Sequence, residues 1–103
     1  GSPVPGTWLT GSARRLMQRM RPGVLATDLL ACHRYAEGLA AAAAVRCPAL
    51  LILGGRDIMA PPRNARALAA ALPSHHAVTL PGCGHAMMAE EPDAVREALL
   101  AVC

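Results

Sequence analysis

The hydrophobic positions in the second half of the chain predict two short strands. Residues 49–53 read Ala-Leu-Leu-Ile-Leu and stop at Gly54-Gly55, and a short run that is apolar on both faces favours a buried parallel strand. Residues 76–80 partly alternate between polar and apolar side chains, and Pro81-Gly82 turns the chain after them. We therefore expect a second strand at this position.

A helix is predicted after each strand. Pro61-Pro62 suits the first positions of a helix, and the apolar stripe that follows at spacings of three and four residues consists of Ala65, Leu68, Ala69 and Leu72. Pro92 opens the last helix, whose stripe consists of Val95, Ala98, Leu99 and Val102. The resulting order, β-α-β-α, implies an α/β fold with parallel strands joined by a right-handed crossover.

The first half of the chain predicts helices only. After an irregular lead-in over residues 1–11 around Trp8, Ser12 suits an N-cap, and the apolar stripe of the first helix consists of Ala13, Leu16, Met17 and Met20. Pro22-Gly23 ends this helix. A second helix runs to Gly38 and carries Leu25, Leu29, Cys32, Tyr35 and Ala36, and residues 39–45 form a short helical turn or a loop.

Composition narrows the class of protein. The chain has 103 residues, of which 53% are hydrophobic, with no Phe, one Trp and one Tyr. The apolar content excludes disorder, and a length of this size fits one domain. The longest uninterrupted apolar run, residues 39–45, is far shorter than a membrane span of roughly 20 residues. Membrane spanning is therefore not expected.

The cysteines and the start of the chain give information on the cellular compartment of the protein. Four cysteines are scattered without C-x-x-C spacing, namely Cys32, Cys47, Cys83 and Cys103. No basic segment followed by an apolar segment marks a secretory signal. We therefore expect reduced thiols inside the core and a cytoplasmic location.

Two residues capable of catalysis follow the predicted strands. Asp57 follows the first strand, shortly after Gly54-Gly55. His85 follows the second strand, directly after the glycine-containing turn at residues 81–84. Functional residues of open parallel sheets lie on loops at the carboxyl ends of strands, and adjacent strands are only about 4.8 Å apart. A carboxylate there would orient the imidazole as a general base. The alternative is an Asp that caps the next helix and a His in an ordinary turn.

The segments around both residues resemble a known family. Residues 47–62 (CPALLILGGRDIMAPP) resemble the late-strand acid motif of α/β-hydrolases, and residues 81–92 (PGCGHAMMAEEP) resemble the G-x-G-H…E-x-P histidine motif of that family. The resemblance implies that Asp57 is the acid and His85 the base of a catalytic triad. Residues 46–103 would then be the C-terminal βαβα part of the hydrolase sheet, preceded by a lid-like or cap-like helical segment, residues 1–45. An unrelated βαβα domain is the alternative.

The sequence departs from the family pattern at the nucleophile. In α/β-hydrolases the nucleophile precedes the acid and lies in a G-x-S-x-G elbow. The three serines, Ser2, Ser12 and Ser74, do not lie in such an elbow. We therefore expect this chain to be the C-terminal portion of a hydrolase, inactive alone, with the nucleophile supplied by an N-terminal part.

Other chemistry around the same loops is less favoured. Cys83 lies two residues before His85, but the backbone between them is expected to direct the two side chains apart. A zinc site built from Cys83, His85, His75 and His76 matches no familiar ligand spacing, so no metal or cofactor is expected. Met59, Met87 and Met88 flank the acid and base loops, where methionine lines an apolar substrate pocket or simply packs.

The charged residues add no further function. The formal net charge is +3, and the first helix carries an arginine cluster, Arg14, Arg15, Arg19 and Arg21. Because neither aromatic stacking residues nor a nucleic-acid-binding fold accompanies the cluster, we expect a solvated helix face that contacts neither nucleic acid nor a membrane.

Two hypotheses about function follow. The first is a hydrolase that acts, in its full-length form, on an ester, lactone or similar small apolar substrate. The second is a non-catalytic module with the same fold that self-associates or pairs with the missing N-terminal part, because the outer edge of the strand at residues 49–53 would lack its usual neighbour.

Overall fold

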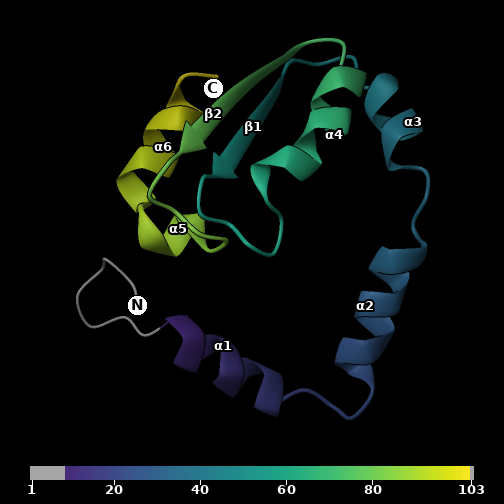
Figure 1. The fold of residues 1–103 in the computed structure, drawn as a ribbon, viewed down its shortest axis with the longest axis vertical. Coiled ribbons are helices and arrows are strands. Elements are labelled where there is room, and N and C mark those ends of the chain that lie inside the picture. The colour runs from purple at the N-terminus through teal and green to yellow at the C-terminus, as the bar shows by residue number, and fades with distance from the viewer. Residues whose placement is uncertain (1–8, 103) are drawn as a thin grey trace.

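A two-stranded parallel sheet organises the C-terminal half of the chain. In the computed structural model, which describes residues 9–102, β1 (Ala49–Gly54) pairs with β2 (His75–Leu80), from Ala49 opposite His75 to Gly54 opposite Leu80. The connection between them contains η1 (Pro62–Ala65) and α4 (Arg66–Ala71). The predicted parallel α/β arrangement is confirmed, and the carboxyl ends of both strands lie at one end of the sheet (Figure 1).

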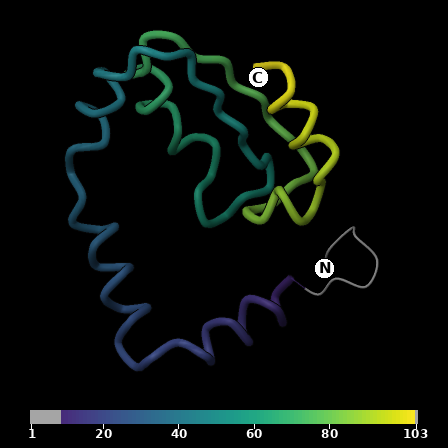
Figure 2. The backbone as a smooth tube through the Cα atoms, turned by 180° about the vertical axis from the view of Figure 1, so that it is seen from behind, coloured from purple at the N-terminus to yellow at the C-terminus, as the bar shows by residue number. Residues whose placement is uncertain are grey.

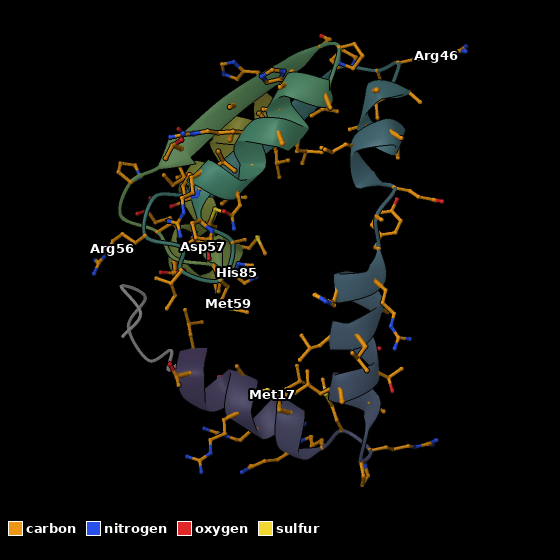
Figure 3. All side chains as sticks on the ribbon, turned by 45° about the vertical axis from the view of Figure 1, so that its right-hand side comes forward. Met17, Arg46, Arg56, Asp57, Met59 and His85 are labelled. Atoms are coloured by element: carbon orange, nitrogen blue, oxygen red, sulfur yellow. The ribbon has the colours of Figure 1, made fainter. Side chains whose placement is uncertain are left out.

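Helices lie on both sides of this sheet. After β2 the chain forms α5 (Met87–Glu90) and α6 (Pro92–Leu100), and α6 packs against β1. Figures 1 and 3 show α4 and α6 on opposite sides of the two strands. α5 was not predicted, because four residues are too few to display a helical stripe in the sequence.

The core lies between β2, α6 and the loop that precedes α5. Leu80, Cys83 and Val95 are buried together, and four partly buried residues pack around them, namely Ile52, Val78, Met87 and Ala94. The predicted stripe of α6 is only half buried, because Val95 and Ala98 face inward whereas Leu99 and Val102 remain about half exposed. Aliphatic and sulfur-containing side chains thus fill this core without aromatic residues.

Three helices precede the sheet: α1 (Leu9–Gln18), α2 (Val24–Arg34) and α3 (Gly38–Ala43). α3 makes residues 39–45 mainly helical, and it packs against α4. We call residues 9–34, with α1 and α2, the N-terminal arm. Figure 2 shows the arm leading away from α3 and curving toward the end of the sheet where the strands finish. No helix within residues 9–102 has the length and apolar character needed to cross a membrane.

The predicted start of the first helix is wrong. Ser12 lies inside α1, and Leu9, Thr10 and Gly11 are already helical rather than irregular. A serine can cap only where a helix begins, so the pattern Ser-Ala-Arg-Arg misplaced the boundary. Trp8 lies outside the described residues.

The other predicted boundaries differ by a few residues. Met20 lies beyond the end of α1, and α2 ends at Arg34 because Tyr35 has an extended backbone conformation. The helix after β1 begins with a 3₁₀ turn at Pro62 and ends at Ala71, before Pro73. These shifts are typical of helix ends, where local propensity is weak.

Gly54 and Gly55 allow the backbone at the end of β1 to approach the backbone of the loop that follows β2. Gly55 donates a hydrogen bond to the carbonyl of Leu80 at 2.9 Å, and Arg56 donates to the carbonyl of Cys83 at 2.8 Å. A Cβ atom on Gly54 would collide with the carbonyl oxygens of Gly84 and Cys83, and one on Gly55 would lie 2.8 Å from the Pro81 backbone. Because backbone atoms cannot rotate away, only glycine fits at these two positions.

We predict that Gly54→Ala lowers the free energy of unfolding by about 1–3 kcal/mol, the usual effect of forcing an extra methyl group into a packed site. Urea unfolding followed by circular dichroism measures the change. Gly82→Ala is the matched control, because a Cβ atom there meets only the Glu91 Oε1 atom at 3.5 Å. Equal stability of the two variants would contradict the proposed backbone collision.

Candidate active site

Asp57 is held in a tight turn directly after β1. Its Oδ1 atom accepts hydrogen bonds from the backbone amides of Met59 and Ala60, both at 2.9 Å, which is the way an Asp side chain closes a local turn. The residue is only 7% exposed. The carboxylate therefore caps its own loop and not the following helix, which begins at Pro62.

His85 extends from the loop after β2 to the second oxygen of the same carboxylate. Its Nδ1 atom lies 2.9 Å from Asp57 Oδ2. The His85 side chain is 55% exposed, whereas that of Asp57 is 5% exposed. Figure 3 shows both residues at the same end of the sheet. With Nδ1 donating to the carboxylate, Nε2 carries the lone pair and is free to accept a proton from a bound group.

The hydrogen bonds around Asp57 favour its ionised form. The amide of Ala60, the His85 ring and the amide of Met59 hold the pKa of Asp57 below its ordinary value of 3.8, although desolvation opposes them. The carboxylate therefore stays negative at neutral pH. A negative acceptor favours the Nδ1–H tautomer of His85.

Cys83 is part of the core rather than of the site surface. Its side chain is completely buried beside Leu80 and Val95. Burial raises the pKa of the Cys83 thiol, and the carboxylates of Glu91 and Glu90 raise it further. Since the thiolate is the reactive form of cysteine, these surroundings oppose a nucleophilic role.

The expectation that the thiols lie in the core is correct for Cys83 and wrong for two others. Cys32 and Cys47 are free but exposed, because the N-terminal arm and the segment before β1 are covered by few neighbours. Cys103 lies outside the described residues.

The residues of the alternative zinc site are far apart along the sheet. His75 and His76 begin the six-residue strand β2, and His85 lies beyond its other end, so roughly 17 Å of strand separates them. Within residues 9–102, no group of three or more His, Cys, Asp and Glu side chains is placed to hold a metal ion.

The three methionines predicted to line a pocket have different surroundings. Met59 is 74% exposed and Met88 is 66% exposed, whereas Met87 packs against the core. Figure 3 shows Met59 near Asp57 and His85, at the end of the sheet where the strands finish and in the direction of Met17 in α1. Packing thus accounts for Met87, and the other two stay candidates for substrate contact.

Glu90 was not assigned a role from the sequence. The backbone amide of Gly84 donates a hydrogen bond to Glu90 Oε1 at 3.1 Å. The signal was present in the E-x-P part of the histidine motif, where Glu90 follows Gly84 by six residues. A spacing of six is neither a helix nor a strand repeat, so a periodicity search could not reveal this contact.

The comparisons with known proteins agree with this fold. The chain matches the alpha/beta hydrolase family over residues 2–98 and belongs to that family. No curated protein and no solved structure matches the chain significantly.

We predict that Asp57 makes the stability of the chain depend on acid pH. A carboxylate with a lowered folded-state pKa contributes stability that is complete above its ordinary pKa of 3.8 and is lost as the pH falls through the folded-state value. The free energy of unfolding of the wild type should therefore fall over this acid range. Asp57→Asn, which keeps an acceptor for the turn, should flatten that part of the profile.

Urea unfolding at a series of pH values checks this prediction. Asp28→Asn is the control, because Asp28 is exposed on α2. An acid-range slope that is the same in wild type and Asp57→Asn would show that another group is responsible.

Proposed function

We propose that this chain supplies the acid and the base of a Ser-His-Asp hydrolase that acts on an ester, lactone or similar small apolar substrate. The 2.9 Å contact between His85 Nδ1 and Asp57 Oδ2, beyond the carboxyl ends of two parallel strands, is the observation that carries the proposal. The buried partner is the charged acid and the exposed partner is the base. A nucleophile outside these residues requires this arrangement, because it must reach the exposed imidazole while the carboxylate orients the ring.

The proposed reaction proceeds through an acyl-enzyme. His85 Nε2 takes the proton of the serine hydroxyl as the serine oxygen bonds to the substrate carbonyl carbon. The imidazolium then gives this proton to the leaving alkoxide as the ester C–O bond breaks. Water repeats the sequence, with His85 again as the base, and releases the acid. The serine is contributed by residues outside this sequence, because none of its serines lies in a G-x-S-x-G elbow.

Exposed apolar side chains that are close in sequence to Asp57 and His85 support an apolar substrate. Ile58 is 91% exposed, and Met59 and Met88 are also largely exposed. Large apolar side chains that remain open to solvent around a site favour ligands with apolar surface. We propose that Met59 and Met88 contact the acyl or alkyl portion of the substrate.

Two further parts of the proposal concern organisation. Residues 1–45 form a lid-like segment and residues 46–103 form the C-terminal part of the hydrolase core. The contrast between the exposed N-terminal arm and the buried cluster of Leu80, Cys83 and Val95 supports this division. The free thiols of Cys32, Cys47 and Cys83 support a cytoplasmic location.

The test is hydrolysis of a short-chain p-nitrophenyl ester. The chain alone should give no turnover, and mixing it with the N-terminal part of the same hydrolase should restore it. In the restored enzyme His85→Ala should lower kcat by roughly 10⁴-fold, as loss of a triad residue does. His76→Ala, at the opposite end of β2, is the matched control and should keep full activity. If the chain alone hydrolyses the ester and His85→Ala abolishes that turnover, the claim that the chain is inactive alone is refuted.

A second candidate function is self-association. The described residues give β1 one strand neighbour, β2, so its other edge has open backbone groups that can pair with another strand. α2 has no buried residue, and it exposes Leu25, Leu29 and Leu30 by 41%, 61% and 49%. Exposed apolar surface of this kind favours burial against a second copy of the chain.

We predict a dimer or larger assembly at high micromolar concentration, measured by light scattering. Leu29→Glu should shift the equilibrium toward monomer, because it places a charge on the surface that would be buried. Arg34→Glu, also exposed on α2, controls for the change of charge. A monomer over the whole concentration range would exclude this function and leave the hydrolase proposal intact.

A further inference from the structure

The loop that carries His85 is held from two sides. We define the histidine loop as residues 81–86. On the β1 side, Arg56 donates a hydrogen bond to the carbonyl of Cys83 at 2.8 Å, and Gly54 closely approaches the carbonyl of Gly84. On the α5 side, the amide of Gly84 donates to Glu90 Oε1 at 3.1 Å. The residue immediately before His85 therefore has its backbone restrained in both directions.

The His85 ring needs such restraint because packing supplies little. The side chain is 55% exposed, so neighbouring atoms cover less than half of its surface. Its described polar contact is the single hydrogen bond to Asp57. The rotamer that brings the ring to Asp57 depends on the backbone that bears it, because the allowed χ1 angles depend on φ and ψ. A displacement of that backbone would therefore separate the two groups.

Glu90 is itself well placed to fix that backbone. It is the last residue of α5, and its own amide donates to the carbonyl of Ala86 at 3.0 Å. Its side chain returns to Gly84 and is only partly exposed. The contact closes a ring from Gly84 to Glu90 that contains His85. A carboxylate that accepts a backbone amide in this way makes a charge-assisted hydrogen bond, which is stronger than a neutral one.

The geometry points to Glu90 as a positioning residue for His85. By holding the Gly84 amide, it fixes the histidine loop in the conformation from which His85 Nδ1 meets Asp57 Oδ2. The effect on catalysis rests on the proposed function, whereas the effect on the Asp57–His85 contact does not. Glu90 accepts a hydrogen bond in this role, so a neutral acceptor of the same length should replace it.

Two variants separate the hydrogen bond from the charge. Glu90→Ala removes the acceptor, and Glu90→Gln keeps an oxygen at the same distance along the side chain while removing the charge. Glu97→Ala is the control, because Glu97 is an exposed carboxylate on the neighbouring helix α6. Circular dichroism and urea unfolding show whether each variant is folded.

The first measurement is the tautomer of His85 in the chain itself, by long-range ¹H–¹⁵N NMR. Wild type, Glu90→Gln and Glu97→Ala should show the Nδ1–H tautomer with a hydrogen-bonded Nδ1 proton. Glu90→Ala should lose that proton signal and show a mixture of tautomers. Loss of the signal in Glu90→Gln, or its retention in Glu90→Ala, would overturn the proposal.

The second measurement is the titration of the Asp57 carboxyl by ¹³C NMR. If Glu90 acted only through its negative charge, Glu90→Ala would lower the pKa of Asp57, because a like charge is removed. A positioning role predicts the opposite. The variant loosens the His85 hydrogen bond that helps to hold the pKa down, so the pKa should rise toward 3.8. An unchanged or lower pKa would count against positioning.

Kinetics of the restored hydrolase complete the test. Glu90→Ala should lower kcat by up to roughly 10²-fold, the usual effect of misplacing a catalytic group by about 1 Å, with little change in KM, and Glu90→Gln should restore most of the rate. If no variant or wild type hydrolyses esters while the NMR results hold, the proposed function fails and the positioning role of Glu90 stands. If esters are hydrolysed and both NMR measurements are insensitive to Glu90→Ala, the proposed function stands and the positioning role of Glu90 fails.

Discussion

The close contact between the loops that follow β1 and β2 is the constraint on which the site depends. Parallel pairing fixes the two strands side by side, and hydrogen bonds from Gly55 and Arg56 extend that pairing beyond the last strand residues. The approach is possible only because Gly54 has no Cβ atom. This approach brings the carboxylate and the imidazole, which are 28 residues apart in sequence, within hydrogen-bond distance.

The two partners in this contact have complementary surroundings. Asp57 is buried, receives two backbone amides and stays ionised, so its position and charge are both fixed by the fold. His85 is largely exposed, which leaves its second ring nitrogen open to a reacting group. In the proposed hydrolase, the fixed carboxylate would orient the imidazole that acts as the base.

Packing is uneven over residues 9–102. The core around Leu80, Cys83 and Val95 is small, whereas the N-terminal arm exposes many of its apolar side chains. Amphipathic helices gain most of their stability by burying an apolar face. The arm has such faces, but the described residues leave them largely exposed. This imbalance motivates both the hydrolase proposal, in which further residues complete the fold, and the self-association proposal.

Local pattern alone determined both strands, the longer helices, the parallel α/β class and the loop positions of Asp57 and His85, because these depend on short-range periodicity and on glycine and proline. Tertiary structure decided what depends on distance between separate segments. It set the 2.9 Å contact of the pair, the burial of Cys83 against the exposure of Cys32, and the bond from Gly84 to Glu90. Periodicity shows which face of an element is apolar, but burial and hydrogen bonding depend on which other segments reach that face.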